Sequence, residues 1–152
     1  MIENQANSEV QMIGKVHIVK TNAAGQVTYD YTVPNLVVTA GKQFIASKLR
    51  ATTNSPVSMT HMAIGTSSTT PAAGDTALGA QTGRVSLSGD TATSNYVTFT
   101  ATFPAGTGDG AIVEAGIFNA SSGGTMLART TFPTVTKGSG DTLAITWIVT
   151  VA

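Results

Sequence analysis

The sequence predicts a mainly β protein, folded as an antiparallel two-sheet β-sandwich or jelly roll. Apolar side chains alternate with Thr and other polar residues along several short runs, a period that is typical of strands with one buried face. In Tyr96–Pro104, for example, the side chains of Val97, Phe99, Ala101 and Phe103 share one face. Turns rich in Gly, Ser and Asn separate the runs, and about eight such runs suit a two-sheet sandwich.

The first two expected strands, Val10–Lys20 and Val27–Val33, form a hairpin. The turn between them contains Gly25, which tolerates positive φ, and Pro34 ends the second strand because proline cannot donate to a ladder. The later strands are expected at Met59–Gly65, Gly83–Ser88, Tyr96–Pro104, Ile112–Asn119, Thr125–Phe132 and Asp141–Val151.

Both faces of Asp141–Val151 carry apolar residues, so this strand is expected to lie in the centre of a sheet or beneath another chain.

One short helix is expected at about residues 39–50. Thr39 is a plausible N-cap, and the last turn carries basic residues, which the helix dipole favours there. Phe44, Ile45 and Leu49 recur at helical spacing, so we expect this stripe to pack against the sandwich.

The chain is expected to form a single β-sandwich domain over residues 10–152, preceded by an extended N-terminal arm at residues 1–9. The arm is polar and unpatterned, which is typical either of a frayed end, the default, or of a peptide that lies across a neighbouring subunit. No secretory leader and no apolar run of membrane-spanning length is visible.

The loop Thr66–Gly79 is long and low in charge, and we expect it to cross between sheets or to reach a neighbour.

Charged residues make up only 11% of the chain, with eight basic and eight acidic residues, so the formal net charge is zero. A surface of Thr, Ser, Asn, Gly and Ala offers little repulsion against association. Nucleic-acid binding is not expected, because the basic residues form no stripe. Candidate interface residues come from the arm and from the long loop: Met1, Ile2, Glu3, Asn4, Gln5, Thr69, Thr70, Pro71 and Asp75.

The sequence predicts no catalytic, metal-binding or cofactor-binding residues, and therefore a protein that is not an enzyme. His17 and His61 stand alone without further ligands at zinc spacing, and the chain has no cysteine. No G-x-S-x-G elbow occurs. The Gly-rich stretch 106–110 lacks the Lys-Ser/Thr pair of a phosphate-binding loop.

Glu114 is unusual because it lies inside an otherwise apolar run. A buried carboxylate is costly unless it is paired and hydrogen-bonded. We expect a structural ion pair with Arg129 or Arg84, which also stand within apolar runs. The alternative role, a general base, would need a cluster of perturbed neighbours.

Four segments together resemble a family of small tailed-bacteriophage virion structural proteins. These segments are His61–Gly79 (HMAIGTSSTTPAAGDTALG), Val113–Asn119 (VEAGIFN), Gly124–Phe132 (GTMLARTTF) and Thr136–Trp147 (TKGSGDTLAITW). The resemblance covers roughly residues 35–152 with the order kept, and it implies a non-enzymatic component of the virion.

Two positions in the particle follow from the resemblance. The favoured expectation is a capsid decoration or cement protein, a trimer seated on the major capsid protein, because the short chain has no coiled-coil or repetitive shaft. The alternative is a tail, baseplate or fibre-associated attachment protein with tail or baseplate partners.

Overall fold

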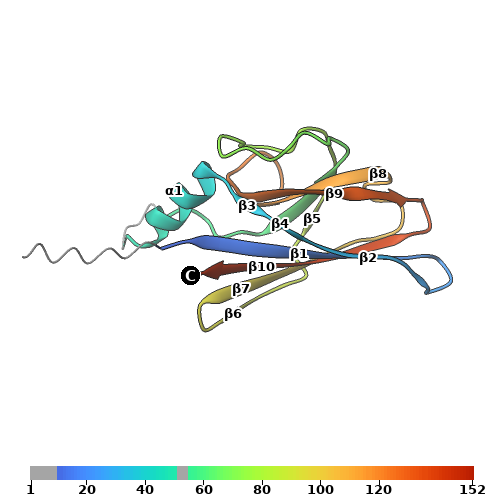
Figure 1. The fold of residues 1–152 in the computed structure, drawn as a ribbon, viewed down its shortest axis with the longest axis horizontal. Helices are drawn as coiled ribbons and strands as arrows, with labels where there is room; N and C mark the ends of the chain where they lie inside the picture. Colours follow the sequence, from blue (N-terminus) through green and yellow to red (C-terminus); the bar gives the residue numbers. More distant parts are fainter. Residues whose placement is uncertain (1–9, 51–54) are drawn as a thin grey trace, which may run out of the picture.

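A computed structural model describes residues 10–50 and 55–152 and shows two five-stranded antiparallel sheets packed face to face (Figure 1). The predicted β-sandwich is therefore confirmed. The predicted arm at residues 1–9 lies outside the described residues. Sheet A contains β1 (Met12–Thr21), β2 (Val27–Pro34), β6 (Gly89–Thr93), β7 (Tyr96–Phe103) and β10 (Thr142–Val151). Sheet B contains β3 (Leu36–Val37), β4 (His61–Gly65), β5 (Gln81–Ser86), β8 (Gly110–Phe118) and β9 (Met126–Lys137).

Sheet A has the strand order β2-β1-β10-β7-β6, so β10 is its central strand. The prediction made from its two apolar faces is confirmed. β1 and β2 form the expected hairpin, with Gly25 at φ 79° in the turn.

Sheet B has the order β3-β9-β8-β4-β5. Here β9 continues past its expected end at Phe132 and contains Pro133. Proline is tolerated because the register with β8 shifts between Ile112 and Glu114, so the ladder is already interrupted beside it.

Two strands were not expected from the sequence. β3 has only two residues, and β6 has the sequence GDTAT, in which no large apolar side chain marks a buried face. Both are edge strands that pair with one neighbour only.

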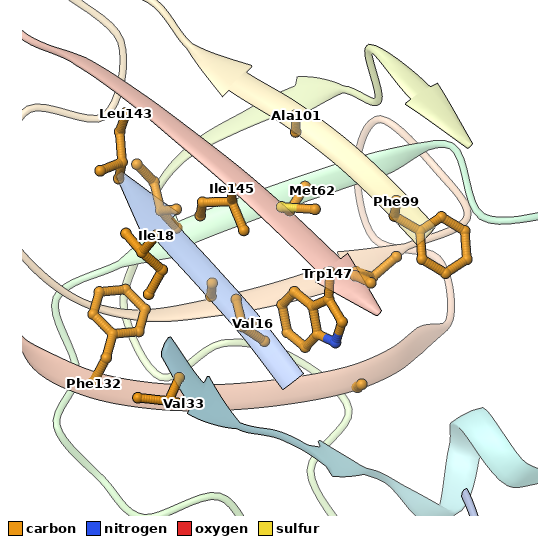
Figure 2. Close-up of a cluster of buried hydrophobic side chains, with 14 of the residues drawn as sticks. Val16, Ile18, Val33, Met62, Phe99, Ala101, Phe132, Leu143, Ile145 and Trp147 are labelled. Carbon is orange, nitrogen blue, oxygen red and sulfur yellow. The ribbon is translucent and has the colours of Figure 1, made fainter. Parts of the chain in front are cut away.

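The inner faces of the two sheets share one hydrophobic core (Figure 2). Trp147 of β10 is the largest fully buried side chain and lies among residues of both sheets. Burying one large apolar side chain contributes about 1.5–3 kcal/mol. The alternating residues Phe99, Ala101 and Phe103 of β7 face this core as predicted.

Helix α1 (Thr39–Lys48) lies at one end of the sandwich (Figure 1). Phe44 and Ile45 pack against the core as expected. The prediction that Leu49 packs is wrong: this residue follows the last helical turn and is 85% exposed. The prediction of Thr39 as N-cap is also wrong, because Val38 occupies that position without a side-chain cap. The amide of Thr39 donates instead to the carbonyl oxygen of Ala73, at 2.8 Å.

Ala73 belongs to the β4–β5 loop (residues 66–80), which joins two neighbouring strands of sheet B. The expectation that this loop crosses between sheets is therefore wrong. Instead it folds over the outer face of sheet B, on the side away from sheet A (Figure 1). Its Leu78 packs against a second, smaller buried cluster: Val38, Ala63, Phe118 and Met126.

Replacing Gly41 by Ala should displace α1 from β9. A Cβ at this position would lie 2.8 Å from the carbonyl carbon of Leu127 and closer still to its oxygen, a backbone group that cannot move aside. We expect a loss of about 1–3 kcal/mol of unfolding free energy in urea denaturation, despite the higher helix propensity of Ala.

Gly74→Ala is the matched control, because an added Cβ there meets no atom within 4 Å. It should change the unfolding free energy by less than about 0.5 kcal/mol. Equal effects of the two substitutions would contradict the close approach at Gly41.

Candidate functional site

Glu114 of β8 points to the outer face of sheet B and is fully buried beneath the β4–β5 loop. Gly65 lies opposite Glu114 in β4. A side chain at Gly65 would collide with the Glu114 carboxylate and with the carbonyl of Ala80, so the glycine makes room for both. The carboxylate thus occupies a space bounded by its own sheet and its own loop.

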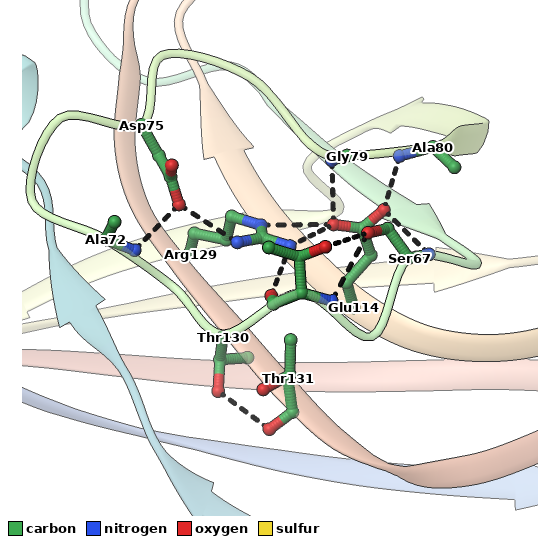
Figure 3. Close-up of polar contacts among 10 residues, drawn as sticks. Ser67, Ala72, Asp75, Gly79, Ala80, Glu114, Arg129, Thr130 and Thr131 are labelled. Carbon is green, nitrogen blue, oxygen red and sulfur yellow. Dashed lines mark hydrogen bonds and ion pairs between the residues drawn. The ribbon is translucent and has the colours of Figure 1, made fainter.

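Donors on three sides surround the Glu114 carboxylate (Figure 3). Its Oε1 accepts hydrogen bonds from the amides of Ala80 at 2.8 Å and Ser67 at 3.2 Å. Its Oε2 accepts from the amide of Gly79 at 3.0 Å. The guanidinium of Arg129 supplies the remaining donors, through Nη2 at 2.8 Å and Nε at 3.1 Å. The desolvated charge is therefore both paired and hydrogen-bonded.

Arg129 of β9 extends this network into the loop. Its Nη1 donates to Asp75 Oδ2 at 2.9 Å, and its Nη2 donates to the carbonyl of Thr69 at 2.9 Å. The same Asp75 oxygen accepts from the amide of Ala72 at 2.9 Å. A buried guanidinium with two carboxylate partners and a carbonyl thus holds both halves of the β4–β5 loop to sheet B.

The protonation of Glu114 follows from two opposing effects. Burial alone raises the pKa of a carboxyl group. The hydrogen bonds from Ala80, Arg129, Gly79 and Ser67 outweigh burial, so the pKa of Glu114 is lowered from its ordinary value of 4.5. A general base for neutral pH needs a raised pKa and access to substrate. The geometry fits a structural carboxylate.

The other expected partner of Glu114, Arg84, does not reach it. Arg84 is on β5, and β4 lies between β5 and the Glu114 strand. Its guanidinium lies 3.8 Å from the centroid of the Phe118 ring. Nη1 donates to the carbonyls of Ala120 and Gly123, both at 3.0 Å. Arg84 therefore holds the turn between β8 and β9.

Lys137 is a second buried cation that sequence reasoning missed, because it stands in a Gly- and Ser-rich stretch that resembles a turn. Its side chain is fully buried at the end of β9. Nζ donates to Asp109 Oδ1 at 2.7 Å and to the carbonyl of Pro104 at 3.0 Å. It fixes the connection between β7 and β8.

The structure describes four of the predicted interface residues. Thr69 and Thr70 are exposed on the β4–β5 loop, while Pro71 and Asp75 are half-buried. Asp75 already bonds Arg129 within the chain. The other predicted interface residues, Met1, Ile2, Glu3, Asn4 and Gln5, lie outside the described residues. Contact of any of these residues with a partner stays a prediction.

The two histidines lie on different strands, His17 on β1 and His61 on β4, and each contacts its own set of polar side chains. His17 Nε2 lies 2.7 Å from Asp30 Oδ1 at the surface. His61 contacts the hydroxyls of Thr60 and Ser86. Over residues 10–50 and 55–152, no three His, Asp or Glu side chains gather in a way that could hold a metal ion. In a separate respect, no helix in these ranges has the length and apolarity needed to cross a membrane.

A second surface feature, also missed from the sequence, is an apolar cleft of about 460 Å³ beside α1. Its walls combine helix, strand and loop residues from both sheets, so no single run of sequence could reveal it. Residues that line it include Met12, Phe44, Ile45, Met59, Val97 and Phe99.

The buried charges of this two-sheet sandwich bind loop backbone and so hold its own loops to the sheets. Residues 31–152 match the family described as phage tail-collar fibre protein, N-terminal. The chain belongs to this family and is a tailed-phage virion structural protein. No curated protein and no solved structure matches it.

Replacing Glu114 by Gln should destabilise the fold by about 3–5 kcal/mol, because it leaves the buried Arg129 guanidinium without its main counter-charge. Urea denaturation measures the effect. Asp75→Asn is the matched control: Asp75 is 27% exposed, and its loss should cost about 1 kcal/mol or less. Similar losses for both variants would contradict the central role of Glu114.

The Glu114 contribution should depend on pH. Because the folded pKa is lowered below 4.5, the stabilisation is complete above pH 4.5 and is lost as pH falls through the folded pKa. The difference in unfolding free energy between the wild type and Glu114→Gln should stay constant between about pH 7 and pH 5 and narrow toward about pH 3. A difference that stays constant down to the acid limit would refute the assignment.

Proposed function

We infer that the protein is a structural component of the phage tail that takes part in joining a fibre to the tail collar. The observation that carries this inference is the family match over residues 31–152, which includes all of sheet B and strands β6, β7 and β10 of sheet A. The proposed role requires rigid, preformed surfaces and no catalytic step.

The loop network supports such a role. Interfaces made by mobile loops lose affinity because ordering the loops costs free energy on binding. Here Arg129 and Glu114 hold the β4–β5 loop in place within the chain, and Ala73 of the same loop caps α1. The exposed Thr69 and Thr70 are therefore presented on an ordered backbone.

The small number of charges also supports assembly. An uncharged polar surface packs against a neighbour without the cost of desolvating ions. Tail proteins and further copies of this chain are the proposed partners. Many modest contacts repeated by symmetry give strong attachment through avidity.

Of the two positions expected from the sequence, the family description favours the tail over the capsid surface. Capsid decoration, with the major capsid protein as partner, has no observation of its own in the structure.

Antibodies against the folded protein should label the tail of intact virions in negative-stain electron microscopy. When heads and tails are separated on a gradient, the protein should be found in the tail fraction. Antibodies against the major capsid protein serve as the control for head labelling. Labelling spread over the head surface would reject the tail role and support decoration.

A further inference from the structure

Strand β6 forms an open edge of sheet A, and among the described strands it pairs only with β7 (Figure 1). Residues that face each other in antiparallel strands alternate between pairs that exchange hydrogen bonds and pairs whose amides and carbonyls point away from each other. Thr93 and Tyr96 flank the turn between β6 and β7 and are a bonded pair. By alternation, the amides and carbonyls of Asp90 and Ala92 point away from β7, toward the open edge.

The side chains of the same two residues line the cleft beside α1. Asp90 and Ala92 face inward, because their partners in β7 are Phe99 and Val97, which pack in or against the core. All four residues line the cleft of about 460 Å³. Asp90 and Ala92 are too small to fill the space that a large residue would occupy between the sheets. This edge therefore joins free backbone groups to an apolar hollow.

The opposite edge of sheet A shows how such a space is closed. Its edge strand, β2, carries Tyr29, whose ring packs against the core and whose hydroxyl donates to the carbonyl of Pro133 in β9 at 2.8 Å. Lys20 of the neighbouring β1 reaches the carbonyl of Thr136 in the same way, at 2.9 Å. The sequence of β6, GDTAT, contains no side chain of that length. The gap between the sheets is bridged at β2 and left open at β6.

The tip of the β6–β7 hairpin is held in a fixed position beside the cleft. Ser94 has φ 55°, in the left-handed region that residues other than glycine rarely adopt. The amide of Val151 donates to the carbonyl of Asn95 at 2.8 Å, and Asn95 Nδ2 donates to the carbonyl of Val151 at 2.9 Å. Because the edge is already ordered, binding there carries a smaller cost in conformational entropy.

The charge on this edge indicates the chemistry of a partner. Asp90 is exposed, and within the described residues it has no ion-pair partner. Opposite charges that face each other across two strands stabilise the pairing. A basic residue is therefore favoured opposite Asp90. Opposite the small Ala92, beside the apolar cleft, a large apolar residue is favoured.

We propose that β6 and the cleft bind an extended segment of a partner protein, which adds to sheet A as a further antiparallel strand. The segment bonds the free backbone groups of Asp90 and Ala92 and places a large apolar side chain in the cleft. Because the added strand runs antiparallel to β6, the apolar residue opposite Ala92 comes first, and the basic residue opposite Asp90 follows two positions later.

Other occupants satisfy only part of this site. A small apolar molecule fills the cleft but leaves the edge amides and carbonyls without partners, and a nucleic acid meets the negative charge of Asp90. The proposal goes beyond the tail role and does not depend on it. The peptide experiments below use the isolated protein, so their failure and the failure of virion labelling are separate results.

The probe is a blocked peptide of sequence TTTFTKTT, in which Phe and Lys share one face of a strand. With this peptide present, hydrogen exchange measured by NMR should slow severalfold at the amides of Asp90 and Ala92. The amide of Thr93, which already bonds Tyr96, should not change and serves as the internal control. Unchanged exchange at Asp90 and Ala92 in millimolar peptide would overturn the proposal, even if the resonances of Phe44 and Ile45 in the cleft shift.

The peptide TTTFKTTT is the matched control, because its Phe and Lys lie on opposite faces of a strand. Only one of these side chains can then face inward, so the peptide should bind about tenfold more weakly than TTTFTKTT. Equal affinity for the two peptides would overturn the pairing of edge and cleft.

A reversal of charge tests the register. Asp90→Lys should weaken the binding of TTTFTKTT about three- to tenfold and strengthen the binding of TTTFTETT by a similar factor. Asp30→Lys is the matched control, since Asp30 is also exposed but lies on β2, at the opposite edge of the same sheet. It should change both affinities by less than about twofold. The proposal is rejected if Asp90→Lys leaves the peptide preference unchanged, or if Asp30→Lys alters it equally.

Discussion

The outer face of sheet B, the β4–β5 loop and α1 depend on one requirement: the buried Glu114 carboxylate must find an ion-pair partner and hydrogen-bond donors. Sheet B alone offers it only Arg129, and the remaining donors are amides of the β4–β5 loop. The loop must therefore fold back over the sheet. Once it does, its Ala73 carbonyl caps α1 and its Asp75 completes the shell around Arg129. One ionised side chain thus couples a strand, a loop and a helix that are distant in sequence.

Buried charge, in this network and in a second pair, removes ions from the surface. Three of the chain's few charged side chains, Glu114, Arg129 and Lys137, are buried and bonded internally. Threonine, serine and small residues make up much of the solvent-facing layer. These internal ions thus give order to the loops.

The sequence was a good guide where a pattern is local. Alternation located the long strands, and the lone acid within an apolar run identified Glu114 as a paired residue. The sequence was a poor guide where an element is stabilised by residues that are distant in the chain. The cap of α1 comes from Ala73, and β6 is held by pairing with β7 and not by its own pattern. The cleft beside α1 draws on segments from both sheets and has no local signal.

The position of β10 has a consequence for biosynthesis. Among the described strands β10 comes last in sequence, yet it pairs with β1 through ten registered positions, from Met12 with Val151 to Thr21 with Thr142. Sheet A cannot close during synthesis until β10 has emerged from the ribosome, so the apolar Val16 and Ile18 of β1 stay unburied until then. Such a high contact order predicts slow folding and strong sensitivity to premature termination.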